Sequence, residues 1–175
     1  MNKFLCYLVF TLLSNFVMGQ KRILSNELSY VVPKSTMNIS LTERLKSVNS
    51  GKNSLIQSSR SGDLLKIDGI SLLLHITPDS SSEDFLRILR NELNFHKTIG
   101  NRKYKIREIT KQNNFSYLLY TYRSADSSSS DMHTLLYVVN DARNKTLKAV
   151  AEYDASETLK ANTIIEDFIK SIKFE

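Results

Sequence analysis

The chain has 175 residues, with 24 Lys and Arg against 18 Asp and Glu, and a formal net charge of +6. A chain of this length supports one domain, which buries about 70% of the surface that its unfolded state exposes. The mild positive charge favours anionic partners in general. The basic residues are not concentrated enough along the sequence to indicate a nucleic-acid-binding protein.

Residues 1–19 have the pattern of a secretory signal peptide. Lys3 supplies the positive start, Phe4–Leu13 is apolar, and Val17 and Gly19 are compact residues at positions −3 and −1 of a cleavage site. The apolar run is shorter than the roughly 20 residues that span a bilayer. We therefore predict cleavage near Gly19/Gln20, export to the periplasm or the medium, and a single domain over residues 20–175. An uncleaved anchor is the alternative.

Cleavage removes the only cysteine, Cys6, so the mature domain has neither a disulfide framework nor thiolate chemistry. It also removes Lys3, which lowers the net charge from +6 to +5. The richness in Asn, Lys, Ile and Ser favours a bacterial source. Asn38, Asn114 and Asn144 open glycosylation sequons, which matter only in a eukaryotic source.

The first half of the domain predicts strands and one helix. Leu28, Tyr30 and Val32 alternate along a strand that Pro33 ends. Asp68-Gly69 lies between two apolar runs and predicts a β-hairpin, because both central residues of such a turn need φ > 0. A capping box of Ser80 and Glu83 predicts the start of a helix that reaches about Phe95. Its predicted buried stripe is Phe85, Ile88, Leu89 and Leu93.

The last third of the chain predicts an antiparallel meander followed by a helix. The three extended runs are Phe115–Arg123, His133–Asn140 and Thr146–Asp154. The helix covers roughly Ser156–Ile172, with Asp154 and Glu157 as its capping pair and a buried stripe that consists of Ala161, Ile164, Ile165, Phe168, Ile169 and Ile172. The strands are apolar on both sides, so they need two covering layers. The predicted fold class is α+β, an antiparallel sheet of about six to eight strands covered by helices on both faces.

One surface feature points to a binding site. It is a basic cluster that consists of Lys97, Arg102, Lys103, Lys105, Arg107 and Lys111. The cluster can dock an acidic protein or another anionic component of the cell envelope. The alternative is structural, because lysines on an edge strand also prevent edge-to-edge aggregation.

The residues point to no catalytic or metal chemistry. His75, His96 and His133 are not spaced as zinc ligands, and we expect a half-buried His75 and a surface pair of His133 with Asp131. No serine lies in a nucleophile motif, and no glycine-rich turn resembles a phosphate-binding loop. We predict no catalytic residue, no metal and no cofactor.

Two segments resemble the PsbP-like family. Leu28–Pro33 looks like the opening strand and proline of these domains, and Ile164–Phe174 looks like their last helix and its Ser-x-Lys-Phe tail. The resemblance covers most of residues 23–174, but the tryptophan often found after the proline is absent. It implies an α/β/α sandwich and a protein that binds others rather than a catalyst. It carries no site residues over to this chain.

We therefore expect an exported, non-catalytic binding or accessory module. The first alternative is an immunity- or inhibitor-type protein that sequesters one toxin or enzyme. The second is a small hydrolase, which would need a deep polar pocket that holds a histidine with a perturbed pKa.

Overall fold

A computed structural model of the chain describes residues 19–25, 28–40, 42–43, 62–77, 83–99, 104–112, 114–123 and 130–174. Residues 1–18 of the predicted signal segment 1–19 and the predicted helix-start residue Ser80 lie outside these ranges. Among the residues that are described, no helix is long and apolar enough to cross a membrane.

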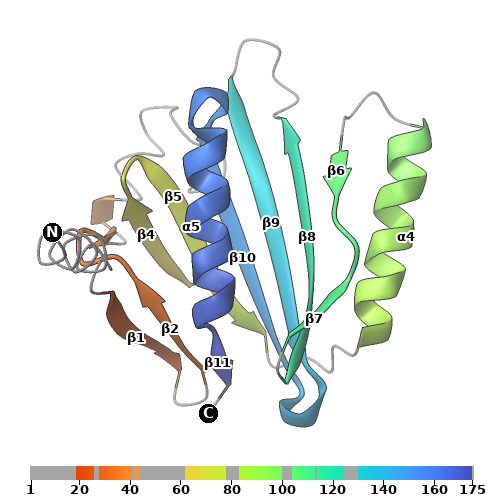
Figure 1. The fold of residues 1–175 in the computed structure, drawn as a ribbon, viewed down its shortest axis with the longest axis horizontal. Coiled ribbons are helices and arrows are strands. Elements are labelled where there is room, and N and C mark those ends of the chain that lie inside the picture. The colour runs from red at the N-terminus through yellow and green to blue at the C-terminus, as the bar shows by residue number, and fades with distance from the viewer. Residues whose placement is uncertain are drawn as a thin grey trace, which may run out of the picture.

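Eight antiparallel strands form the larger sheet. In chain order they are β3 (Met37–Asn38), β4 (Asp63–Ile67), β5 (Ile70–Thr77), β6 (Tyr104–Ile106), β7 (Thr110–Gln112), β8 (Phe115–Arg123), β9 (Asp131–Asn140) and β10 (Lys145–Asp154). Their spatial order is β3-β4-β5-β10-β9-β8-β6, and β7 also pairs with β8. The α+β class with a large antiparallel sheet is thereby confirmed (Figure 1).

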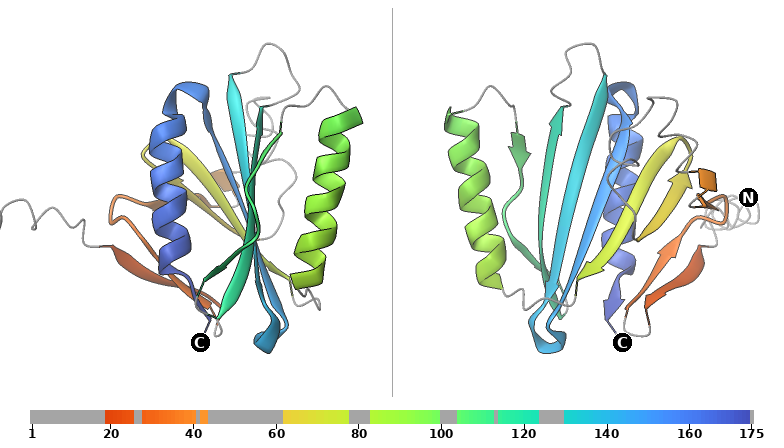
Figure 2. Two further views of the ribbon diagram at one scale, coloured as in Figure 1. Left: turned by 45° about the vertical axis from the view of Figure 1, so that its right-hand side comes forward. Right: turned by 180° about the vertical axis from the view of Figure 1, so that it is seen from behind.

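A smaller sheet and two long helices complete the architecture. The smaller sheet has the order β1-β2-β11, from β1 (Gln20–Ser25), β2 (Leu28–Val32) and β11 (Lys173–Phe174). The helices are α4 (Glu83–Ile99) and α5 (Thr158–Ser171), and the short 3-10 turns η1 (Asp141–Arg143) and η2 (Ala155–Glu157) precede β10 and α5. Figure 2 shows α5 and α4 on either side of the larger sheet.

The turn between β4 and β5 has the predicted hairpin geometry. Asp68 and Gly69 have φ of 47° and 91°, and Ile67 pairs with Ile70 across the turn. The meander is also confirmed, with β8 at its predicted bounds and β9 and β10 each beginning earlier than predicted. The chain order alone does not show that β10 pairs with β5 on its other side.

The first hydrophobic core lies between α5, the smaller sheet and one face of the larger sheet. Ala161, Ile165, Phe168, Ile169 and Ile172 are buried there, as predicted, and Ile164 is partly buried. The Phe168 ring meets the Tyr30 ring of β2 edge-on, with centroids 5.4 Å apart. Burial raises the pKa of Tyr30 to about 12. The start of the helix differs from the prediction, because Asp154 accepts from Ser156 whereas Glu157 pairs with Lys160.

The second core lies under α4, and here the predicted stripe is wrong in part. Leu86 and Leu93 are buried against Leu118, Leu135 and other residues of the sheet. Phe85 and Ile88, two members of the predicted stripe, are exposed. The predicted stripe and the observed pair Leu86 and Leu93 both follow helical spacing. Spacing therefore does not fix the rotation of the helix, and the packing of Leu86 and Leu93 against the sheet decides it.

Candidate functional site

A hollow lies where α5 leaves part of the larger sheet uncovered. We call it the α5 hollow. Its volume is about 140 Å³, and it is lined by Lys105, Arg107, Leu119, Thr121, Met132, Thr158 and Asn162. Pockets that enclose drug-sized ligands have roughly 300–1,000 Å³. The α5 hollow therefore fits one side chain or a small anion.

One wall of the hollow is a polar stripe on α5. Thr158, Asn162 and Glu166 are four residues apart and so lie on one side of the helix. The Thr158 hydroxyl donates to the carbonyl of Ala155, which fixes this side chain at the start of the helix. The wall thus offers a hydroxyl and an amide, and the carboxylate of Glu166 lies one turn further along the same side of the helix.

The opposite wall carries two cations on the edge of the sheet. Lys105 of β6 is the register partner of Thr121, so both side chains point to the same face. The backbone N–H of Arg107 donates to the carbonyl of Leu119 over 2.9 Å, which holds the segment after β6 against β8. Arg107 Nη1 lies 3.1 Å from Glu166 Oε1 on the facing helix.

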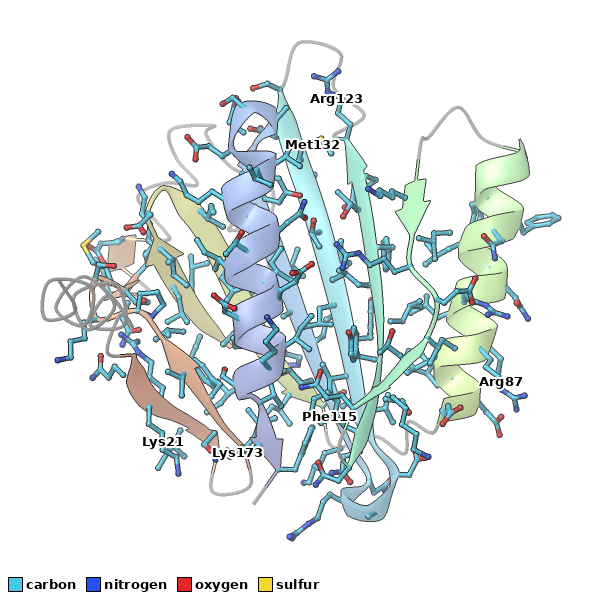
Figure 3. The ribbon with its side chains drawn as sticks, in the orientation of Figure 1. Lys21, Arg87, Phe115, Arg123, Met132 and Lys173 are labelled. Atoms are coloured by element: carbon cyan, nitrogen blue, oxygen red, sulfur yellow. The ribbon has the colours of Figure 1, made fainter. Side chains whose placement is uncertain are left out.

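The floor is part apolar and part hydroxyl. Leu119 and Met132 supply the apolar part. Thr121 Oγ1 is 2.9 Å from Thr134 Oγ1, which is 2.8 Å from the hydroxyl of buried Tyr153. Arg123, the register partner of Met132, lies at the same end of the sheet (Figure 3). A chain of hydroxyls therefore runs from the core to the floor of the hollow.

The predicted basic cluster divides between the two faces of the sheet. Lys105 and Arg107 lie at the α5 hollow. Lys111 is the register partner of Ser116, whose hydroxyl donates to Glu83 of α4, so Lys111 belongs to the α4 side. The side chain of Lys97 and the residues Arg102 and Lys103 lie outside what the structure describes. The cluster as a whole remains a prediction, and the hollow adds α5 residues that the sequence did not single out.

His133 differs from its prediction as a surface residue paired with Asp131. It is 5% exposed, stacks on Tyr122 with centroids 5.0 Å apart, and places Nδ1 3.9 Å from Glu152 Oε2. Burial lowers the pKa of His133, although the charge of Asp131 acts in the opposite direction. The pairing with Glu152 arises from the β9–β10 register, which local sequence does not reveal. Half-buried His75 is as predicted.

These histidines do not form the pocket that a hydrolase would need. His75 belongs to β5, His96 to α4 and His133 to β9. The α5 hollow is not lined by a histidine, nor is the small void beneath α5 between Phe168 and the sheet. Within the described part of the chain, the cationic hollow is the feature best suited to a ligand.

Comparisons with solved structures identify similar folds. The solution structure of cyanobacterial PsbP (CyanoP) from Synechocystis sp. PCC 6803 matches with a TM-score of 0.58 at 12% identity, over 92% of this chain and 95% of that one. The Ran-binding protein Mog1p of Saccharomyces cerevisiae matches with a TM-score of 0.50 at 7% identity, over 90% and 96%. A Mog1 point mutant gives 0.50 at 8% identity, over 89% and 95%. No family model and no curated protein matches the sequence.

Proposed function

We propose that this chain is an exported, non-catalytic binding module of the PsbP-like family. We further propose that it holds an acidic segment of a protein partner in the α5 hollow. The fold likeness to PsbP and Mog1 supports a binding module, and the signal-like pattern of residues 1–19 supports export. The observation that carries the site is the position of Lys105 and Arg107 opposite the polar stripe of α5.

The chemistry of the hollow favours a carboxylate on a peptide. A guanidinium and an ammonium form charge-assisted hydrogen bonds with carboxylates. The floor residues Leu119 and Met132 offer apolar contacts beside those cations. A partner segment in which acidic residues alternate with apolar ones would contact both the cations and the apolar floor. A bare inorganic anion would use only the charges.

The test is an NMR titration of the ¹⁵N-labelled mature protein with the peptide acetyl-Glu-Leu-Glu-Leu-Glu-amide. We expect amide shifts centred on Lys105, Arg107, Thr121 and Asn162, and none with the matching peptide in which Gln replaces Glu. Charge reversal of Lys105 or Arg107 should weaken binding roughly 10-fold, about 1.4 kcal/mol. The control is Lys111→Glu, which makes the same change of charge on the α4 side of the sheet.

Two results would overturn the proposal. One is the absence of peptide binding at the hollow. The other is an equal loss of affinity in Lys111→Glu, which would mean that only the net charge matters. Parallel titrations with a heparin oligosaccharide and with phosphatidylglycerol vesicles separate the other anionic classes. Binding of either one at the hollow without the peptide would replace the acidic protein as the partner.

A further inference from the structure

Glu166 contacts Arg107, one of the two cations that line the α5 hollow. Its Oε1 is 3.1 Å from Arg107 Nη1. It follows Thr158 and Asn162, which line the hollow, at four-residue spacing on the same side of α5, and it reaches the hollow through its contact with Arg107. The chain therefore presents its own carboxylate to the group that would receive a carboxylate of the partner.

The Arg107–Glu166 ion pair can separate with little loss of free energy. The side chains of Arg107 and Glu166 are 44% and 47% exposed. Exposed pairs contribute little to stability, because water solvates both charges once they separate. The contact uses one Nη atom of Arg107, whereas a guanidinium can bind a carboxylate through two parallel N–H donors. A partner carboxylate with both oxygens available would therefore bind Arg107 more fully than Glu166 does.

We infer that Glu166 is an internal competitor, which occupies Arg107 until an acidic segment of the partner displaces it. The inference rests on the proposed function, since it concerns the same hollow. Its consequence is selectivity. A segment with a single weak anionic contact would not displace Glu166, whereas one that also fills the Leu119 and Met132 floor would.

The experiment compares Glu166→Gln with Asp167→Asn in the same peptide titration. Asp167 is the next residue of α5, about 100° further round the helix. Its side chain is 68% exposed and pairs with Lys170 at 3.5 Å. Both variants remove one negative charge from the same helix. We expect Glu166→Gln to bind the acidic peptide about 2- to 5-fold more tightly. Asp167→Asn should change the affinity by less than about 1.5-fold, because the Asp167 carboxylate pairs with Lys170 and not with Arg107, and surface pairs of this kind contribute little.

A double-mutant cycle tests the competition directly. In an Arg107→Gln background, Glu166→Gln should no longer improve affinity, because no guanidinium remains to be released. An equal gain in Asp167→Asn, or an undiminished gain in the Arg107→Gln background, would overturn the inference. If charge reversal at Lys105 and Arg107 weakens binding but Glu166→Gln does not strengthen it, the hollow is the binding site and Glu166 is not a competitor. If charge reversal has no effect, the proposed function itself fails.

Discussion

Phe168 joins three parts of the fold, so its truncation should be costly. It is 3% exposed, meets Tyr30 of β2 edge-on, and lies over Leu136 and Ala149 of the larger sheet. Truncation of a buried Phe to Ala costs about 3–5 kcal/mol, and domains of this kind have total stabilities of about 5–15 kcal/mol. We therefore expect Phe168→Ala to remove about a fifth or more of the free energy of unfolding.

Chemical denaturation in urea, extrapolated to water, measures this loss. Phe168→Leu keeps most of the apolar volume and should cost only about 1–2 kcal/mol, mainly the aromatic pair with Tyr30, which contributes about 0.5–1.5 kcal/mol. Leu159→Ala, at an exposed position of the same helix, should stay within about 0.5 kcal/mol of the wild type. A loss below about 1.5 kcal/mol for Phe168→Ala would refute the packing of α5 described here.

Three further predictions test the backbone, the hydroxyl chain and the buried histidine. Gly62→Ala should destabilise the fold, because Gly62 has φ of 94° and a Cβ there would lie 2.2 Å from a main-chain oxygen of β5. Gly69→Ala, with φ of 91° and no neighbouring atom within 4 Å, should cost only the backbone strain, about 1–3 kcal/mol, and Gly62→Ala should cost more. Equal losses of stability in the two variants would contradict the clash at Gly62. Thr134→Val should cost about 1–3 kcal/mol of stability, since it leaves the buried hydroxyl of Tyr153 without its Thr134 partner. Tyr153→Phe should destabilise the Thr134→Val variant less than it destabilises the wild type, and equal losses would show that the two hydroxyls are not coupled. The lowered pKa of His133 means that the unfolded chain binds a proton more readily than the folded one. Stability should therefore be full above pH 6.5, the ordinary pKa of histidine, and fall as the pH drops through the folded pKa. Denaturation curves at several pH values measure this, and His133→Gln should lose this part of the pH dependence. The same dependence of stability on pH in wild type and variant would refute the prediction.

Local patterns predict most of the fold because its elements carry strong local signals. The alternation in Phe115–Arg123 gives β8 at its observed bounds. Asp68-Gly69 gives the hairpin, since few other residue pairs adopt two positive φ values. The rotation of α4 is different, because Phe85 and Leu86 both belong to apolar stripes of helical spacing. Only the side chains across the interface select Leu86.

The candidate site was only half predictable. Lys105 and Arg107 stand out as cations near an edge strand, but their faces follow from pairings with β8. Glu166 and Asn162 look like ordinary solvent-facing residues of an amphipathic helix. They become part of a site because α5 packs against the sheet beside β8, a contact between segments about 40 residues apart or more. No short sequence window contains that information.

The position of β10 also limits when the protein can fold. This strand lies between β5 and β9, so it joins the first hairpin to the meander. Until Lys145–Asp154 has been synthesised, β5 and β9 each have an open edge, and β2 lacks its partner β11 until Lys173 and Phe174 have been added. Contacts between segments so distant in sequence slow folding. A nascent chain of this topology cannot complete its larger sheet before β10 has been synthesised.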